Sequence, residues 1–196
     1  MKKFFIVAGI LSLFLLPIES RAQHNDNRTT PRYIEPEITH CAYTTGYGWY
    51  QEPQGIICGT GFHQGMNVAF EFVSNQSYQI NSIEGWMDLL DLDPGAIEVA
   101  DCDLVIYAGT DYNKNYGYIP DTDSEIFRQH FSFDVENHCY GHDWHGINFT
   151  ADNHLTLEPG TYWVAFENGS PVGGLVINSG YDGGNAIRLG VDVGRD

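Results

Sequence analysis

The sequence predicts an all-β protein, a jelly-roll-like antiparallel β-sandwich that forms a single domain over residues 37–196. Apolar and polar residues alternate with a period of two in several short segments, whereas helical periodicity is nearly absent. Turn sequences rich in Gly, Pro and Asp separate these segments, in a chain with 22 glycines. Helix-like segments do not alternate with the strand-like ones and no internal repeat is visible, which argues against a parallel sheet, a propeller or a solenoid.

Five segments alternate clearly enough to predict half-buried strands rich in β-branched and aromatic residues. In chain order they are Met66–Val73, Ile97–Ala108, Ile126–Phe133, Thr161–Glu167 and Ala186–Val193. The last is the most regular, because Ile187 and Leu189 fall on one side and Arg188 falls on the other.

The remaining segments are less regular. Trp86–Leu92 fits one helical turn, but Ile80, Ile83 and Trp86 fit a strand with a bulge at Gly85 equally well. Turns are expected at 93–95, 158–160 and 182–184. Residues 109–125 form a long polar loop in this interpretation, and loops of that length are usually functional or disordered.

The first 22 residues have the pattern of a secretory signal peptide. Lys2 and Lys3 precede an apolar stretch from Phe4 to Ile18, which small residues suited to cleavage follow. An uncleaved anchor is the alternative, although the stretch is short for a bilayer. Residues 23–36 are polar and predict a flexible leader. We therefore expect a secreted protein, extracellular or periplasmic, with no membrane span in the mature chain.

The chain is strongly acidic, with 26 Asp and Glu against 9 Lys and Arg, a net charge of −17. Residues 1–22 hold three of the bases and one acid, so the rest of the chain carries −19. Such a chain cannot neutralise phosphates, which excludes nucleic acid as a partner. An anionic membrane surface is disfavoured for the same reason.

Four cysteines, an even number in an exported chain, predict two disulfides. Three pairings of Cys41, Cys58, Cys102 and Cys139 are possible. Proximity in sequence favours Cys41–Cys58 and Cys102–Cys139. Neither pair has CxxC spacing, which argues against a redox enzyme or a zinc ribbon.

Four short motifs stand out between residues 83 and 190. They are Ile83–Met87, Trp144–Ile147, Leu155–Glu167 with its Leu-x-x-Gly-Thr-Tyr-Trp sequence, and Ala186–Gly190. Together they resemble a class of exported bacterial β-sandwich domains, many of which carry a PEP-CTERM-type or another C-terminal anchor. The resemblance implies a location and a fold but no chemistry. The chain ends at Gly194-Arg195-Asp196 without such a sorting signal, so we expect a protein that is not anchored in this way.

An aromatic segment, Tyr43–Tyr50, is the first candidate binding site. Tyr47, Trp49 and Tyr50 belong to a segment with two glycines, and flat aromatic faces on such a loop can stack on sugar rings. The alternative is that these rings cover one end of the core.

Three histidines within eight residues are the second candidate. His138, His142 and His145, with Asp143 beside them, have the ligand types of a transition-metal site. The spacing is not the HExxH of zinc peptidases. A solvated polar loop is the alternative.

A third candidate lies within the polar loop. Asp111, Asn113 and Asn115 place oxygen ligands at alternating positions, which suits Ca²⁺, although the rest of an EF-hand loop is missing. The alternative is a solvated acidic loop.

No nucleophile elbow, phosphate-binding loop or dinucleotide motif is present in the sequence. The sequence therefore favours a secreted, non-catalytic extracellular module that binds a glycan or another surface polymer, or that has a structural role. A metal-dependent hydrolase using the loop from His138 to His145 is the alternative. Ca²⁺ and a transition metal are the only cofactors that the sequence suggests.

Overall fold

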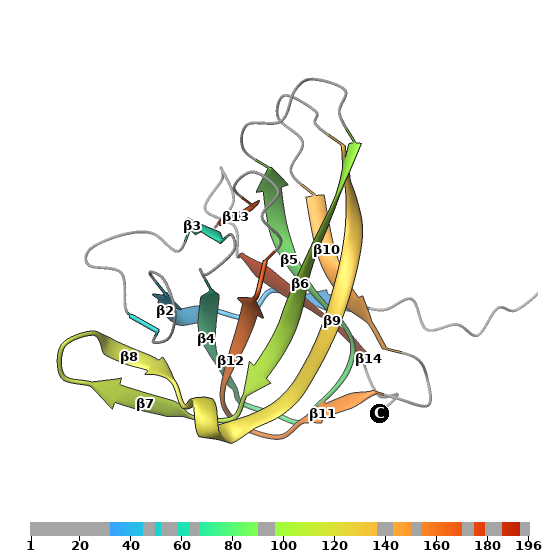
Figure 1. The fold of residues 1–196 in the computed structure, drawn as a ribbon. Helices are drawn as coiled ribbons and strands as arrows, with labels where there is room; N and C mark the ends of the chain where they lie inside the picture. Colours follow the sequence, from blue (N-terminus) through green and yellow to red (C-terminus); the bar gives the residue numbers. More distant parts are fainter. Residues whose placement is uncertain are drawn as a thin grey trace, which may run out of the picture.

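A computed structural model describes residues 32–44, 50–51, 59–62, 67–89, 97–136, 143–149, 154–169, 175–178 and 186–192 (Figure 1). Two antiparallel sheets pack against each other, which confirms the predicted all-β sandwich. Among the described residues, no helix has the length and apolar character needed to cross a membrane. Residues 1–31, with the predicted signal peptide and most of the leader, lie outside the described part.

The larger sheet has seven strands. Its path runs β1 (Arg32–Ile34), β14 (Ile187–Asp192), β5 (Tyr78–Leu89), β13 (Leu175–Asn178) and β3 (Gly59–Phe62), while β10 (Asp143–Asn148) and β11 (Leu155–Leu157) also pair with β5. The smaller sheet has five strands in the order β2 (Ile38–Tyr43), β4 (Val68–Ser74), β12 (Gly160–Glu167), β6 (Ile97–Tyr107) and β9 (Glu125–Glu136).

The chain passes repeatedly from one sheet to the other, as in a jelly roll. β4, β5 and β6 alternate between the sheets, and so do β11, β12 and β13. The five alternating segments of the sequence all lie in strands, namely β4, β6, β9, β12 and β14, so these predictions are confirmed.

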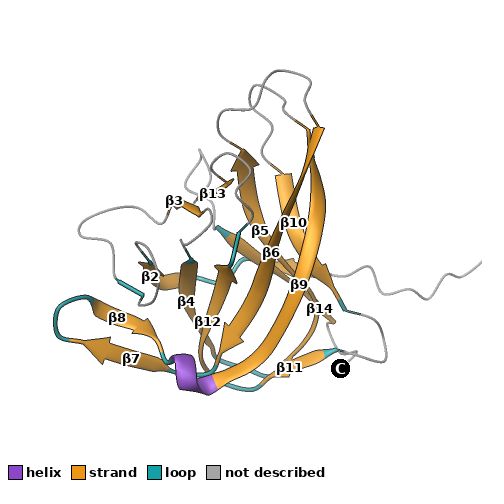
Figure 2. Ribbon diagram, in the orientation of Figure 1, coloured by secondary structure: helices purple, strands orange, loops and turns teal. Residues whose placement is uncertain are grey.

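Residues 109–125 are not a loop, and that prediction is wrong. They form a hairpin of β7 (Thr110–Asn113) and β8 (Gly117–Pro120), followed by the short 3-10 helix η1 (Thr122–Ser124) (Figure 2). The hairpin turns where Tyr116 N donates to Asn113 O at 3.0 Å, and Gly117 follows with a φ of 83° that suits glycine.

The predicted bulge at Gly85 is also wrong, because Gly85 pairs in register with Ile187 and with His145. The irregularity of β5 lies instead opposite Gly190 and Val191. Gly85 is required for packing: a Cβ there would lie 2.9 Å from the ring of Phe166 on the facing sheet.

The main core lies between the two sheets. The five-stranded sheet contributes its inward row of aromatic and aliphatic side chains, and the seven-stranded sheet contributes a facing aliphatic row. The largest fully buried members are Phe70, Phe72, Leu104, Ile106 and Phe166 on one side and Ile80, Ile83, Met87 and Leu157 on the other.

The five-stranded sheet is buried on its outer face as well. Ala42, Ala69 and Ala165 lie opposite one another on β2, β4 and β12, and these small side chains leave room for a second apolar cluster. That cluster also contains Tyr50, Val105, Tyr107, Ile119 and Trp163. We call Tyr50 and the β7–β8 hairpin, which supply side chains from outside this sheet, the covering layer. Burial on both faces explains why almost every residue of β4 and β12 is buried.

Candidate functional site

Tyr50 was predicted to face a ligand, and the structure corrects this. Paired backbone hydrogen bonds of 2.8 Å between Tyr43 and Gln51 set Tyr50 beside the end of β2. Tyr50 is 3% exposed, and its hydroxyl donates to Oε1 of Glu167 at 2.5 Å. The ring therefore covers the sheet, which was the alternative interpretation. Tyr47 and Trp49 lie outside the described residues.

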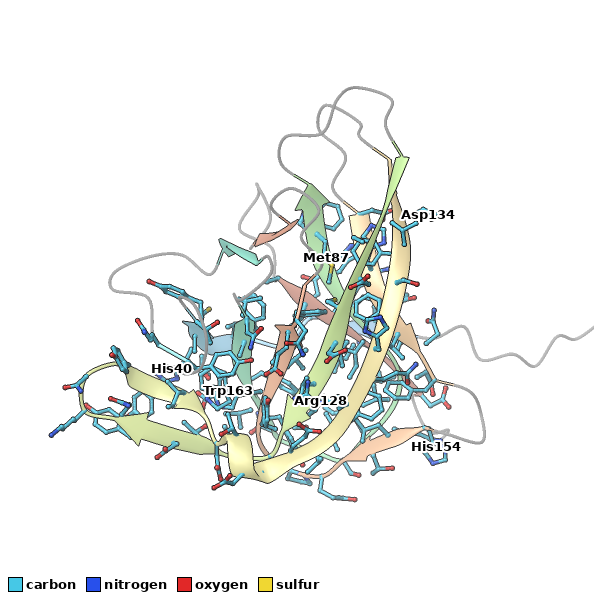
Figure 3. The ribbon with its side chains drawn as sticks, in the orientation of Figure 1. His40, Met87, Arg128, Asp134, His154 and Trp163 are labelled. Atoms are coloured by element: carbon cyan, nitrogen blue, oxygen red, sulfur yellow. The ribbon has the colours of Figure 1, made fainter. Side chains whose placement is uncertain are left out.

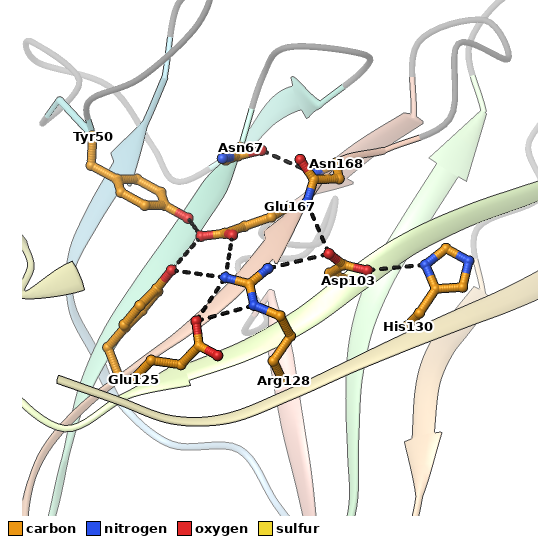
Figure 4. Close-up of polar contacts among 9 residues, drawn as sticks. Tyr50, Asn67, Asp103, Glu125, Arg128, His130, Glu167 and Asn168 are labelled. Atoms are coloured by element: carbon orange, nitrogen blue, oxygen red, sulfur yellow. Dashed lines mark hydrogen bonds and ion pairs between the residues drawn. The ribbon is translucent and has the colours of Figure 1, made fainter. Parts of the chain in front are cut away.

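Glu167 is the buried centre of a polar network on this outer face (Figure 4). It is 6% exposed at the end of β12. Its Oε1 also accepts a hydrogen bond from the Tyr107 hydroxyl at 2.7 Å, and its Oε2 pairs with Nη2 of Arg128 at 2.9 Å. A buried carboxylate needs such partners, since leaving it unpaired would cost several kcal/mol.

Arg128, on β9, joins Glu167 to two further acids. Its guanidinium pairs with Glu125 at 2.8 Å and with Asp103 at 3.2 Å. Asp103 also accepts from Nδ2 of Asn168 at 2.8 Å and lies 3.0 Å from Nδ1 of His130. Burial alone would raise the pKa of Asp103, but these hydrogen bonds outweigh it and lower the pKa overall.

Every carboxylate of this network is occupied by protein partners, and the guanidinium lies between them. These hydrogen bonds and ion pairs link β6, β9 and β12 to one another and to Tyr50. We interpret the network as a structural element.

The predicted transition-metal site is only partly described. His138 and His142 lie outside the described residues, while His145 lies on β10 and not in a loop. Its ring stacks on Phe133 with centroids 4.2 Å apart, and burial lowers its pKa, which Asp143 opposes. In the described ranges, no group of three His, Cys, Asp or Glu side chains is placed to hold a metal. The metal site and the hydrolase based on it stay predictions.

The predicted calcium residues lie on the hairpin. Oδ1 of Asp111 accepts from the backbone N of Tyr112 at 2.7 Å, and Oδ1 of Asn113 accepts from the backbone N of Asn115 at 2.9 Å. These oxygens therefore shape the hairpin locally. Calcium binding at Asp111, Asn113 and Asn115 stays a prediction.

Cys102 is a buried free thiol, so the predicted Cys102–Cys139 bridge is not formed. Cys102 pairs with Phe131, and the β6–β9 ladder continues for five more residues of β9 to Glu136. At about 3.3 Å per residue the end of this ladder is about 17 Å away, whereas a disulfide needs Cα atoms within about 7 Å. Proximity in sequence was misleading because the described part of β9 runs away from Cys102 toward Glu136.

The other predicted pair is undecided. Cys41 is buried on β2 and is not a free thiol, but Cys58 lies outside the described residues. The Cys41–Cys58 pairing stays a prediction.

Glu71 joins the hairpin to the sheet at the opposite side of the outer face. Its carboxylate accepts hydrogen bonds from Thr110 at the start of β7, from Thr39 at 2.6 Å and from Nδ1 of His40 at 2.6 Å. Thr110 in turn accepts from Nε1 of the buried Trp163 at 2.9 Å. The Trp163 side chain is labelled in Figure 3. Burial alone would raise the pKa of Glu71, but the three hydrogen bonds outweigh it and lower the pKa overall.

Next to the hydrogen-bonded Glu71, three aromatic rings lie in a row, one each from β2, β8 and β7. The His40 ring lies 4.4 Å from that of Tyr118, and Tyr118 lies 5.3 Å from Tyr112 in an edge-to-face contact. Tyr112 is 63% exposed and Tyr118 is 44% exposed. We call His40, Tyr118 and Tyr112 the aromatic stripe. Tyr116, in the turn between β7 and β8, is exposed as well.

The sequence alone does not predict this stripe. Tyr112, Tyr116 and Tyr118 stand on both sides of an Asn-Lys-Asn turn, and a hairpin interpretation of that turn would have paired Tyr112 with Tyr118. His40 could not have been found, because it meets Tyr118 only through the packing of β2 against β8.

A second aromatic group lies on the outer face of the seven-stranded sheet, where β5, β10 and β14 bring three of the four sequence motifs together. The guanidinium of Arg188 lies 4.1 Å from the ring centroid of Tyr33 and 4.5 Å from that of Trp144, and its Nε pairs with Glu84. Trp144 also contacts Trp86 at 5.2 Å. The guanidinium lies over both flanking rings, so this group stabilises the sheet through cation–π contacts.

No family model, curated protein or solved structure matches the chain. The resemblance to exported bacterial β-sandwich domains therefore stays a prediction.

Proposed function

We propose that this protein is a non-catalytic extracellular module that binds a glycan or another surface polymer on the aromatic stripe. The observation that carries the proposal is the exposure of Tyr112 and Tyr118, which adjoin each other and His40 on one side of the hairpin. The export signal in the sequence supports an extracellular location. Exposed aromatic rings with polar edges are the usual means by which proteins grip flat, partly apolar ligands such as sugar rings.

The rigidity of the hairpin also supports binding. Ile119 is buried in the outer apolar cluster, and Thr110 is held by Glu71 and Trp163. The two tyrosines are therefore presented on a supported hairpin, and little conformational freedom remains to be lost when a ligand binds. A catalytic role finds no comparable support among the described residues, because the buried carboxylates Glu71 and Glu167 are occupied by protein partners.

Pull-down on insoluble polysaccharides, followed by titration of the best ligand, tests the proposal. Tyr112→Ala should weaken binding about tenfold, which corresponds to about 1.4 kcal/mol for the loss of one stacked ring. Tyr33→Ala is the matched control, because Tyr33 is 43% exposed but lies on the other sheet. The proposal would be refuted if the wild type bound no polysaccharide or cell-wall polymer. Equal losses of binding in Tyr112→Ala and Tyr33→Ala would refute it as well.

A further inference from the structure

His40 connects the buried carboxylate of Glu71 to the exposed tyrosines. Its Nδ1 lies 2.6 Å from Oε2 of Glu71, while its ring contacts Tyr118. The two nitrogens of an imidazole point in nearly opposite directions, so Nε2 is turned away from the carboxylate. His40 is partly exposed, and its Nε2 has no hydrogen-bond partner within the described part of the chain.

The surroundings of Glu71 determine which nitrogen carries the proton. Thr39 and Thr110 both donate to the Glu71 carboxylate, and Thr110 uses a lone pair to accept from Trp163 while its own hydrogen serves the carboxylate. These bonds favour the ionised carboxylate, which can only accept. Nδ1 of His40 must therefore donate, and in the neutral imidazole this leaves Nε2 as a bare acceptor.

We propose that His40 determines the specificity of the aromatic stripe, its Nε2 accepting a hydrogen bond from a hydroxyl of a neutral glycan that stacks on Tyr118 and Tyr112; this rests on the proposed function. A stacked ring alone does not select a ligand, since any flat apolar face suffices. An acceptor held at the end of the stripe by a buried carboxylate requires a hydroxyl donor at a set position.

The charges around the stripe favour a neutral ligand over an anionic one. Asp111, Asp121 and Asp123 lie on or beside the hairpin, and Lys114 in its turn is the only base of that segment. Glu71 lies directly behind His40. A polyuronate or a sulfated glycan would meet this negative field together with the net charge of −17, whereas a neutral glucan, mannan or xylan would not.

The test compares four proteins on neutral glucan, mannan and xylan and on polygalacturonate. His40→Phe keeps a ring against Tyr118 and removes the acceptor, and it should weaken binding to the preferred neutral glycan at least tenfold. His40→Gln restores an acceptor and should stay within about threefold of the wild type. Thr39→Val removes a different hydrogen bond to the same oxygen of Glu71 and leaves Nε2 in place, so it should bind like the wild type. Thermal melting of each variant checks that it is folded.

Glu71→Gln is a further variant, tested beside these four proteins. A glutamine amide that donates to Nδ1 forces the proton onto Nε2, and this converts the acceptor into a donor while His40 remains. Binding should then fall as in His40→Phe. A folded His40→Phe that binds like the wild type, while Tyr112→Ala does not, would overturn the role of His40 and leave the proposed function standing. Preference for polygalacturonate would overturn the neutral ligand class. Absence of binding to every glycan would remove both proposals.

Discussion

Removing the Tyr50 hydroxyl should destabilise the protein by about 2 kcal/mol. Tyr50→Phe keeps the buried ring and deletes one donor to the Glu167 carboxylate, at an O···O distance of 2.5 Å and with both residues at most 6% exposed. A hydrogen bond to a charged group contributes about 1.5–3 kcal/mol, and here Tyr107 still satisfies the same oxygen. The expected loss is therefore in the lower half of that range.

The double variant Tyr50→Phe/Tyr107→Phe sharpens this prediction. Each single change leaves Oε1 of Glu167 with one donor, but the double change leaves it with none among the described residues. We expect a loss of about 5–6 kcal/mol, more than the sum of about 4 kcal/mol for the single variants, because an orphaned buried acceptor costs extra. Urea unfolding of the wild type, both single variants and the double variant measures the coupling.

Tyr112→Phe is the control, because Tyr112 is exposed and should change stability by less than about 0.5 kcal/mol. The reasoning is refuted if Tyr50→Phe matches this control, or if the double variant is simply additive.

Tyr50 also predicts how the stability of the protein changes at alkaline pH. Burial raises the pKa of Tyr50 well above its ordinary value, and the charge of Glu167 adds to the shift. Above pH of about 10 the unfolded chain loses the tyrosine proton and the folded chain keeps it. The folded state then binds more protons, so stability falls as the pH rises. Tyr50→Phe should make that decline shallower, which unfolding measured between pH 9 and pH 11 would show.

Three further predictions concern separate sites. Ser82→Ala should be neutral or stabilising in urea unfolding, since Ser82 Oγ is buried without a partner among the described residues. Gly190→Ala should destabilise the protein, because the new Cβ would overlap that oxygen. The double variant should recover much of this loss of stability, and simple additivity of the two changes would contradict the prediction. The lowered pKa of Glu71 means that its ionised form stabilises the fold at neutral pH, and this contribution is lost on acidification below about pH 4.5, so that unfolding titrations should show a weaker acid dependence in Glu71→Gln. Without reductant, alkylation followed by mass spectrometry should label Cys102 in urea but scarcely in the native protein, because burial raises the pKa of its thiol; an unlabelled Cys102 in urea would restore the predicted bridge.

Period-two alternation was sufficient to predict the strands, because burying one face of a strand imposes that period. It could not predict burial on both faces. On β12, Val164 and Phe166 pack on one face, and Trp163 on the opposite face is buried as well because the hairpin covers it. The composition of the 109–125 segment suggested a loop, since polar residues and glycine are common to loops and to exposed hairpins.

The contacts of the site lay beyond sequence reasoning for a topological reason. Glu167 meets Tyr50 across 117 residues of chain, and His40 meets Glu71 across 31. Such pairs depend on the order of strands in the sheet, which local pattern does not contain. Tyr50 has a side chain that can stack on a sugar ring. Whether such a ring is buried against the protein or faces solvent depends on the same strand order.

Burial of the five-stranded sheet on both faces has a consequence for how the protein unfolds. On β12, Phe166 belongs to the core between the sheets and Trp163 to the cluster beneath the covering layer. Neither cluster can lose its packing without exposing a face of the same strand, so the two should melt together. Trp163 fluorescence and the circular dichroism of the sandwich should then report one transition at one temperature, and the hairpin that carries the stripe should remain closed up to it.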